Sequence, residues 1–183
     1  MKRVCAVLLL AVITTIVSAS PITGLLERID RGASKKFIIE EVKSDTDFFE
    51  LDQKGSRVVI RGNNSVSIAT GLNWYLKYYA GIHLSWNGMT ATLPDVLPPV
   101  MKKERHETKL PWRYDLNYCT YSYSMAFWDW ERWEKEIDWM ALHGINLPLA
   151  ITGTETVWYN VLQKLGYKKT GIDEFISGQG FFA

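Results

Sequence analysis

The sequence predicts an α/β chain in which a small N-terminal α/β domain precedes the first two strand–helix units of an incomplete (β/α)8 barrel, the TIM-barrel fold. Three observations lead to this prediction. Short β-branched runs surround one helical pattern, a proline-rich and charged stretch follows, and strand-like and helical segments then alternate across short connections. We place the small domain at residues 20–101, a linker at 102–111 and the start of the barrel at 112–183.

Residues 1–19 have the three-part layout of a secretory signal peptide. The charged start at Lys2 and Arg3 precedes an apolar run at residues 4–17. Residues 17–19 (VSA) are typical of a cleavage site. The apolar run is short for a membrane span, and an uncleaved anchoring helix is the alternative. We therefore expect the mature chain in the secretory pathway, with the lysosome or the cell exterior as its destination and no membrane association after cleavage.

The composition excludes two classes of protein. With 21 Lys and Arg against 20 Asp and Glu, the formal net charge is +1, so no basic surface for nucleic acid is expected. Cys5 is removed with the predicted signal peptide, so Cys119 is the one cysteine of the mature sequence. A small fold held by internal disulfides is therefore excluded. A glycosylation sequon begins at Asn63 (NNS), and the predicted signal peptide gives it access to the glycosylation machinery.

Short runs of β-branched and aromatic residues predict the strands of the N-terminal domain. These runs lie at residues 36–42, 48–51, 57–61 and 82–86. Turns are expected at residues 53–55 and at Asn87-Gly88, the latter a hairpin signal.

One helix is predicted in this domain, beginning with Ser65 as its cap and ended by Gly81. Its apolar stripe consists of Ile68, Leu72, Tyr75, Leu76 and Tyr79. No segment of the domain is typical of a reaction centre.

Beyond Pro111 the pattern becomes strand, helix, strand, helix. The strands are predicted at residues 113–119 and 145–151, and the helices at 129–143 and 154–165. Asp129 is the expected N-cap of the first of these helices, and Gly144 and Gly166 end the two. The predicted apolar stripe of the first helix consists of Trp130, Trp133, Ile137, Met140 and Ala141. The acidic residues of this helix are expected mostly on its wet or framework side and are poor catalytic candidates; they include Glu134, Glu136 and Asp138.

Alternate residues of the two predicted strands differ in polarity. The apolar set should pack under the helices and consists of Tyr114, Leu116, Tyr118, Ile145, Leu147, Leu149 and Ile151. The opposite set is polar or small, with Asn117 and Cys119 at the end of the first strand. A doubly covered open sheet is normally apolar on both faces, so this pattern favours a barrel whose interior opens into a site at its C-terminal mouth.

The segment at residues 117–130 (NYCTYSYSMAFWDW) crowds aromatic rings and hydroxyl groups directly after the first strand. Active sites of such barrels lie at strand ends and in the loops that follow them. Aromatic faces with polar tips suit a sugar pocket, but Tyr121, Tyr123 and Trp128 can equally seat the loop on the barrel rim. Cys119 has no matching histidine motif for a nucleophile, which favours a buried small residue lining the site.

Glu155 has two interpretations. Residues 152–155 (TGTE) fit a capping box with Thr152 as the N-cap, and this pattern favours a structural role. Glu155 also lies just past the second strand, at the mouth where substrate would bind. The sequence has no Gly-rich phosphate loop, zinc-type histidine spacing or serine elbow.

The segment at residues 113–167 closely resembles the alpha-N-acetylglucosaminidase family. Its block WDWERWEKEIDWMALHGIN is long and compositionally odd, and the upstream VVIRGNNSVSIATGLNWYLKYYAGIHLSW is similar to the small N-terminal domain of the same family. The resemblance implies a small α/β domain, a (β/α)8 barrel and a mostly helical C-terminal domain. It also implies a retaining exo-hydrolase that releases terminal α-linked N-acetylglucosamine from glycans such as heparan sulfate. Such an enzyme uses two glutamates as acid/base and nucleophile and needs no metal or organic cofactor.

The resemblance also implies roles for residues of the aromatic loop. Asn117 and Cys119 match residues that line the sugar pocket, and Tyr123 matches a position in the same loop. Glu155 is the further candidate for substrate contact. A full barrel takes ~250 residues, whereas this chain offers about two of the strand–helix units. We therefore assign no catalytic residue here and expect the catalytic glutamates beyond Ala183, so the chain alone should be unstable and inactive.

Two other functions are compatible with the residues. One is a secreted, non-catalytic α/β sugar-binding module that reuses the aromatic loop. The other is a different glycosidase with a similar preceding domain, and the specific block at residues 113–167 argues against it. The sequence leaves the oligomeric state open, an oligomer of the full-length protein included.

Overall fold

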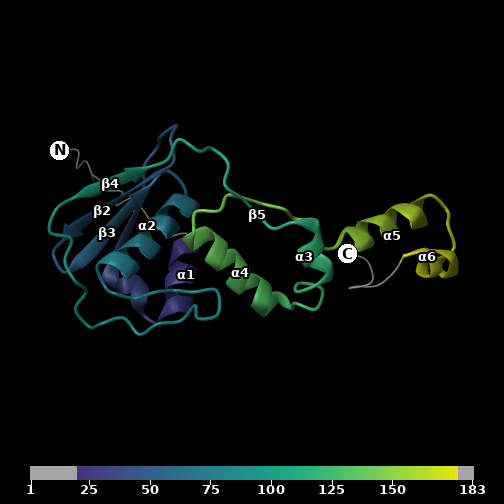
Figure 1. Cartoon of the computed structure of the whole chain (residues 1–183), viewed down its shortest axis with the longest axis horizontal. Helices are drawn as coiled ribbons and strands as arrows, with labels where there is room; N and C mark the ends of the chain where they lie inside the picture. The colour runs from purple at the N-terminus through teal and green to yellow at the C-terminus, as the bar shows by residue number, and fades with distance from the viewer. Residues whose placement is uncertain (1–19, 177–183) are drawn as a thin grey trace, which may run out of the picture.

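The computed structural model describes residues 20–176, so the predicted signal peptide lies outside the described residues. An N-terminal α/β body is followed by segments that extend away from it (Figure 1). The body contains a four-stranded sheet of order β1-β3-β2-β4. Its strands are β1 (Phe37–Glu41), β2 (Phe48–Lys54), β3 (Arg57–Gly62) and β4 (Glu104–Glu107). Its helices are α1 (Pro21–Ile29), the short 3-10 helix η1 (Ala33–Lys36) and α2 (Ser65–Tyr78).

The central strand of the sheet is the predicted β-branched run. Val58, Val59 and Ile60 of β3 are almost completely buried, at 0%, 1% and 0% exposure. β3 pairs in parallel with β1 and antiparallel with β2, and Gly55 turns the β2–β3 hairpin at φ 62°. The turn comes slightly later than predicted, because β2 continues in register to Lys54 opposite Arg57.

Helix α2 covers the sheet with the predicted stripe. Ile68, Leu72 and Tyr75 are among its buried residues. Its N-cap is Asn64, whose Oδ1 accepts from Ser67 N at 2.8 Å, so the predicted cap at Ser65 is wrong by one residue. An amide oxygen caps a helix as well as a hydroxyl does, and the chain offers both side by side.

Three parts of the body differ from the sequence prediction. The strand predicted at residues 82–86 is reduced to an isolated bridge between Ser85 and Gly88, because no neighbouring strand pairs with it. Helix α1 was not predicted, although Ser20 caps it and proline opens it. The predicted linker at 102–111 carries β4, which pairs antiparallel with β2 and completes the sheet.

Beyond the body, the two predicted barrel strands are parallel, as expected, but short. They are β5 (Tyr114–Asp115) and β6 (Leu147–Pro148). The strand predicted to reach residue 119 is wrong from Leu116 onward. Leu116 has φ 69°, a left-handed conformation that ends an extended run, and the next residue caps a helix. The helices here are α3 (Tyr118–Ser122), α4 (Trp130–Leu142), α5 (Thr154–Lys164) and α6 (Lys169–Phe175).

Helix α4 belongs to the core of the N-terminal body. Leu142 is fully buried in that core, and its carbonyl oxygen accepts from Asn73 Nδ2 at 3.1 Å. The predicted stripe is right only in part: Met140 is buried and Ala141 packs against the core, whereas Trp130 and Ile137 are 68% and 46% exposed. The buried face is partly acidic, because partners from the N-terminal body satisfy the carboxylates there.

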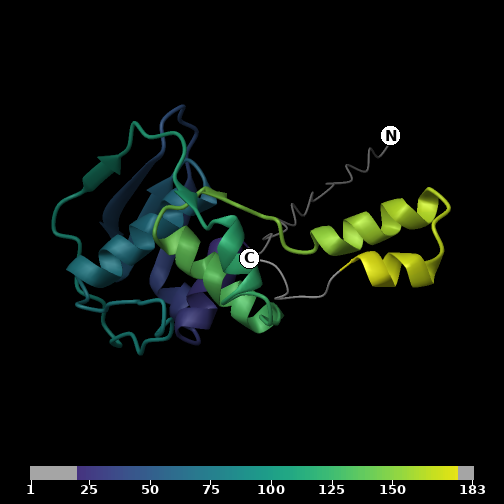
Figure 2. The ribbon, with the colours of Figure 1, turned by 45° about the vertical axis from the view of Figure 1, so that its right-hand side comes forward.

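The two apolar strand faces are not covered by helices, contrary to prediction. Tyr114 and Leu147 are 58% and 43% exposed. Helices α5 and α6 pack on each other and extend beyond α3, away from the sheet (Figures 1 and 2). No residue of α5 is buried, which leaves the strands without the cover that a crossover helix would give.

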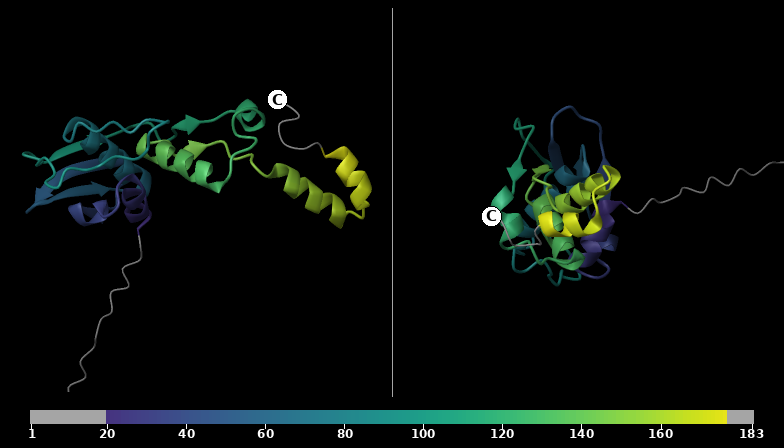
Figure 3. Two further views of the ribbon diagram at one scale, coloured as in Figure 1. Left: turned by 90° about the horizontal axis from the view of Figure 1, so that it is seen from below. Right: turned by 90° about the vertical axis from the view of Figure 1, so that its right-hand side faces the viewer.

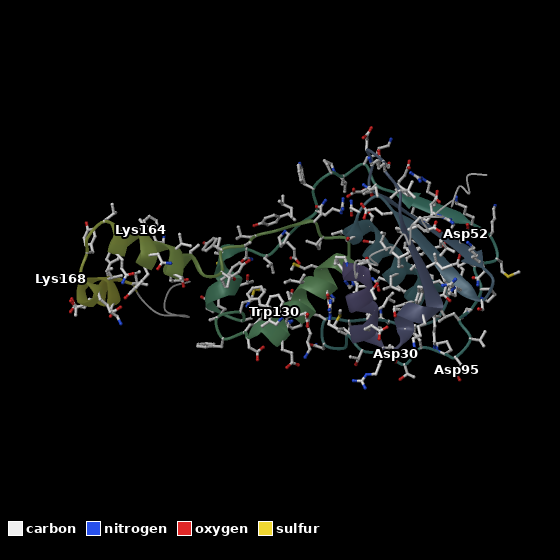
Figure 4. The ribbon with its side chains drawn as sticks, turned by 180° about the vertical axis from the view of Figure 1, so that it is seen from behind. Asp30, Asp52, Asp95, Trp130, Lys164 and Lys168 are labelled. Carbon is white, nitrogen blue, oxygen red and sulfur yellow. The ribbon has the colours of Figure 1, made fainter. Side chains whose placement is uncertain are left out.

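The body and the α5–α6 pair lie at opposite ends of an elongated arrangement (Figure 3). Figure 4 labels Lys164 and Lys168 at one end and Asp52 at the other, with Trp130 of α4 between them. No helix among residues 20–176 combines the length and apolar character needed to cross a membrane.

Candidate functional site

The loop that follows β5 contains three of the predicted substrate contacts. Asn117 is exposed and caps α3, its Oδ1 accepting from Thr120 N at 3.2 Å. Cys119 lies within α3 and is partly buried, and Tyr123 is 69% exposed just after it. Their predicted inward-facing places on a strand are therefore wrong. They still lie directly after the C-terminal end of β5, where barrel enzymes bind substrate.

Tyr118 and Cys119 are neighbours at the start of α3. The hydrogen bond between the two side chains raises the pKa of Tyr118 above its ordinary value. Tyr118 is 68% exposed, so this side chain is open to solvent next to the thiol.

Among the described residues no group of three or more His, Cys, Asp and Glu side chains could hold a metal ion.

The aromatic rings of this loop divide into packed and exposed groups. Tyr121 stacks on Trp133 at 6.0 Å, and Trp128 meets Trp133 edge-on at 5.1 Å between ring centroids. Burial raises the pKa of Tyr121, in keeping with a hydroxyl withdrawn from water. The structure thus gives Tyr121 and Trp128 the packing role that the sequence left open. The exposed group consists of Tyr118, Tyr123, Phe127 and Trp130, at 58% exposure or more.

Glu155 lies in the first turn of α5 and is exposed. The predicted capping box is wrong, because the N-cap is Gly153 at φ 82° and makes no side-chain bond. The helix thus begins one residue later than the capping box requires, after a glycine in the left-handed conformation, and Thr152 is not its N-cap. Glu155 is therefore free of the structural role that the pattern favoured.

A network that the sequence analysis missed joins this loop to the N-terminal body. Glu136, only 3% exposed, accepts from the indole Nε1 of Trp86 at 2.7 Å and pairs with Arg132 at 3.0 Å. Of the two predicted locations, the wet side and the framework side of the helix, Glu136 thus occupies the framework side, where Trp86 binds its carboxylate. The spacing of Arg132 and Glu136 was a visible signal of an ion pair along the helix, but the third partner lies 50 residues away.

Asp138 is the second buried carboxylate of α4, at 8% exposure, and it also lies on the framework side of the helix. It receives two hydrogen bonds from Arg28 of α1, at 2.6 and 2.7 Å. The bond to Asp138 raises the pKa of Arg28, so the guanidinium keeps its charge at any physiological pH. Both buried acids of α4 are thus bound to structural partners and neither is free for acid–base chemistry.

A second junction surrounds Arg113, just before β5. Its guanidinium donates to Asp47 Oδ2 at 2.6 Å and also to the carbonyl oxygen of Gly144. Burial tends to raise the pKa of Asp47, but hydrogen bonds from Asn63, Arg113 and Asn64 together hold it below its ordinary value. A cavity of ≈ 180 Å³ lies beside this junction, lined mostly by body residues and by Arg113 and Gly144.

The side-chain amide of Asn63, the predicted glycosylation site, is engaged within the body. Its Nδ2 donates to Asp47 at 2.9 Å, and its Oδ1 accepts from Phe48 N and Ser67 Oγ. The nitrogen has a second hydrogen that no protein acceptor takes in the described part of the chain, so an attached sugar can coexist with these bonds.

Comparisons with known proteins cover almost the whole described chain. Residues 20–99 match the family model of the alpha-N-acetylglucosaminidase (NAGLU) N-terminal domain. Residues 113–183 match that of the alpha-N-acetylglucosaminidase (NAGLU) TIM-barrel domain. The chain is 44% identical over 142 residues to alpha-N-acetylglucosaminidase of Homo sapiens, covering 77% of this chain and 19% of the human protein.

Solved structures give the same likeness in three dimensions. The family 89 glycoside hydrolase from Clostridium perfringens in complex with PUGNAc aligns with a TM-score of 0.80 and 38% identity. The alignment covers 87% of this chain and 19% of the bacterial chain. A variant of that enzyme bound to its substrate GlcNAc-α-1,4-galactose aligns with a TM-score of 0.78 and 40% identity, over 86% of this chain and 18% of the other. The chain thus spans about a fifth of the length of these relatives.

Proposed function

Because this chain belongs to the alpha-N-acetylglucosaminidase family and carries its N-terminal portion, we propose that it is the N-terminal part of a retaining exo-glycoside hydrolase. The enzyme removes terminal α-linked N-acetylglucosamine from glycans such as heparan sulfate. One observation carries the proposal: the two consecutive family domains match in order, and the second begins with parallel strands followed by an aromatic, polar loop.

The loop after β5 is proposed to contact the terminal sugar. Asn117 offers an amide and Tyr123 a phenol to sugar hydroxyls, and the exposed ring of Tyr123 can pack on the apolar face of the hexose. Cys119 is proposed to line the same pocket, and Glu155 to reach it from the start of the next helix. A retaining mechanism needs two carboxyl groups ~5 Å apart. The buried acids of α4 are occupied, so we propose that both catalytic glutamates lie in the part of the relatives that this chain does not span.

The route of the chain is proposed to be the secretory pathway. The signal-peptide pattern of residues 1–19 supports this route, and the accessible amide hydrogen of Asn63 supports attachment of a glycan. The lysosome is the proposed destination, with the cell exterior as the alternative.

Activity measurements on two proteins test the proposal. The chain from Ser20 to Ala183 should release no product from an aryl α-N-acetylglucosaminide. The protein encoded by the whole open reading frame should release N-acetylglucosamine with retained anomeric configuration, which proton NMR of the first product detects. Hydrolysis by the shorter chain, or inversion by the longer one, would contradict the proposed mechanism.

The sugar-binding role of Asn117 has a matched control in the same loop. In the full-length enzyme, Asn117→Ala should lower kcat/KM by about tenfold or more, because it removes a polar contact at the sugar. Ser124→Ala, an exposed position nearby, should change kcat/KM by less than about twofold. Equal effects of the two substitutions would contradict the assignment.

A non-catalytic sugar-binding module is the second candidate, and the exposed rings of the loop favour it specifically. Such a module would bind N-acetylglucosamine without hydrolysing it. A transcript that stops directly after the codon for Ala183, together with sugar binding by the isolated chain, would favour the module over the enzyme.

A further inference from the structure

The buried carboxylate of Glu136 lies where the N-terminal body meets the aromatic loop. One of its oxygens, Oε2, accepts both from Trp86 Nε1 at 2.7 Å and from Arg132 Nη2 at 3.0 Å. Trp86 belongs to the turn after α2 in the N-terminal body, whereas Arg132 and Glu136 belong to α4. A carboxylate at 3% exposure is stable only when such donors satisfy it. The three side chains therefore fix one another.

Arg132 connects Trp86 and Glu136 to the aromatic loop through a contact with Trp128. Its guanidinium lies 4.6 Å from the ring centroid of Trp86 and 3.9 Å from that of Trp128. Both distances are within the range of cation–π attraction, and the two indoles are themselves in contact at 6.3 Å between ring centroids, so the cation contacts both rings. Trp128 is the last ring before α4 begins at its cap Asp129.

From Trp128 the contacts continue to α3. Trp128 meets Trp133 edge-on at 5.1 Å, and Trp133 stacks on Tyr121 at 6.0 Å. Tyr121 is a residue of α3, the helix that contains Cys119 and is capped by Asn117. A continuous set of ring and hydrogen-bond contacts thus joins Trp86 in the body to the helix with the candidate sugar contacts.

We propose that Glu136 is a positioning residue: by binding Trp86 and Arg132 together, it lets the N-terminal domain hold the substrate-binding loop in place. This inference rests on the proposed function, because the loop that Glu136 holds in place is the segment proposed to contact the sugar. It assigns the N-terminal domain a part in substrate binding, although nothing within that domain is typical of a reaction centre. The domain supplies Trp86, whose indole N–H binds the carboxylate of Glu136.

Hydrogen–deuterium exchange of the protein encoded by the whole open reading frame tests the proposal. Glu136→Gln keeps the size of the side chain but removes its charge, so the ion pair with Arg132 is lost and the amide oxygen accepts only the weaker hydrogen bonds of a neutral group. We expect exchange in residues 118–128 to become about tenfold faster, with β3 amides exchanging at the wild-type rate. Glu134→Gln is the matched control. Glu134 lies two residues earlier on α4, where it pairs with Arg28 at 3.5 Å and is not part of the Trp86–Arg132–Glu136 network. It should leave exchange in the loop unchanged.

Two further substitutions separate positioning from general destabilisation. Trp86→Phe keeps an aromatic ring over Arg132 but removes the indole N–H, so it should accelerate loop exchange less than Trp86→Ala does. In the full-length enzyme, Trp86→Phe should raise KM several-fold, about threefold to tenfold, with kcat changed by less than about twofold.

The proposal is overturned if Glu136→Gln leaves loop exchange unchanged, or if β3 and the loop accelerate equally. It is also overturned if Trp86→Phe lowers kcat without raising KM. Exchange is measured without substrate, so failure of the proposed activity would leave the network result intact. Failure of the network, conversely, would leave the family and its activity intact.

Discussion

Replacing Asp138 with asparagine should destabilise the chain, because Asp138 joins α4 to α1 across the N-terminal body. Its two oxygens accept from Arg28 Nε and Nη2 at 2.6 and 2.7 Å. The side chain of Asp138 is 12% exposed and that of Arg28 is 41% exposed. Asparagine keeps the shape but removes the charge and one acceptor, so one guanidinium N–H loses its partner.

The magnitude follows from this geometry. Hydrogen bonds to charged groups contribute about 1.5–3 kcal/mol each. Arg28 retains partial access to water, which offsets part of the loss, so we expect Asp138→Asn to lower the free energy of unfolding by about 1.5–3 kcal/mol in total. For a chain of this size, that loss corresponds to a melting temperature lower by about 4–10 °C.

Urea unfolding of the protein encoded by the whole open reading frame, monitored by tryptophan fluorescence, measures this loss. Glu134→Gln is the control, because Glu134 lies 3.5 Å from the same arginine but its side chain is 36% exposed. Its substitution should cost less than about 0.5 kcal/mol. A loss below about 0.5 kcal/mol for Asp138→Asn, or equal losses for both variants, would refute the reasoning that α4 is anchored through this pair.

Three further predictions concern the body. Asp47 has a lowered pKa, so its contribution to stability should be complete above the ordinary value of 3.8 and should disappear as the pH falls through the lowered value. The melting temperatures of wild type and Asp47→Asn should therefore converge in that acidic range. A difference in melting temperature that does not change with pH would contradict the assignment. Burial raises the pKa of Tyr75 to about 12, so its stabilisation should be lost between pH 10 and that value. Tyr75→Phe should remove this alkaline loss and cost about 1 kcal/mol at neutral pH, because the hydroxyl donates to Pro98 O at 2.6 Å; an unaltered alkaline transition would count against it. The secreted chain should lose mass on glycosidase treatment, whereas Asn63→Gln should show no such loss; an identical shift in both would exclude Asn63 as the site.

The sequence predicted the elements whose signals are local. The β-branched run of β3, the parallel pairing of β5 with β6 and the cap of α4 at Asp129 are confirmed. Each was indicated by a local pattern in the sequence, although the pairing of β5 with β6 itself joins Tyr114 to Leu147 across α3 and α4. The periodicity of α2 predicted its buried stripe for the same reason.

The errors arise where the structure of a segment depends on features that its own sequence pattern does not show. The apolar stripe of α4 was right only in part, because Arg28 and Trp86, far upstream, bind acidic residues of the helix and bury them. The strand predicted through Asn117 was wrong because Leu116 adopts a left-handed conformation that its sequence neighbours do not reveal. As a result, the candidate residues were placed in the right loop but on the wrong kind of element.

Expression of the whole open reading frame, followed by an assay with an aryl α-N-acetylglucosaminide, tests the central claim most directly. The frame should continue beyond the codon for Ala183 and encode a protein that releases N-acetylglucosamine, and Asn117→Ala should weaken that activity. A stop codon directly after Ala183, or substrate hydrolysis by the chain from Ser20 to Ala183 alone, would contradict the claim.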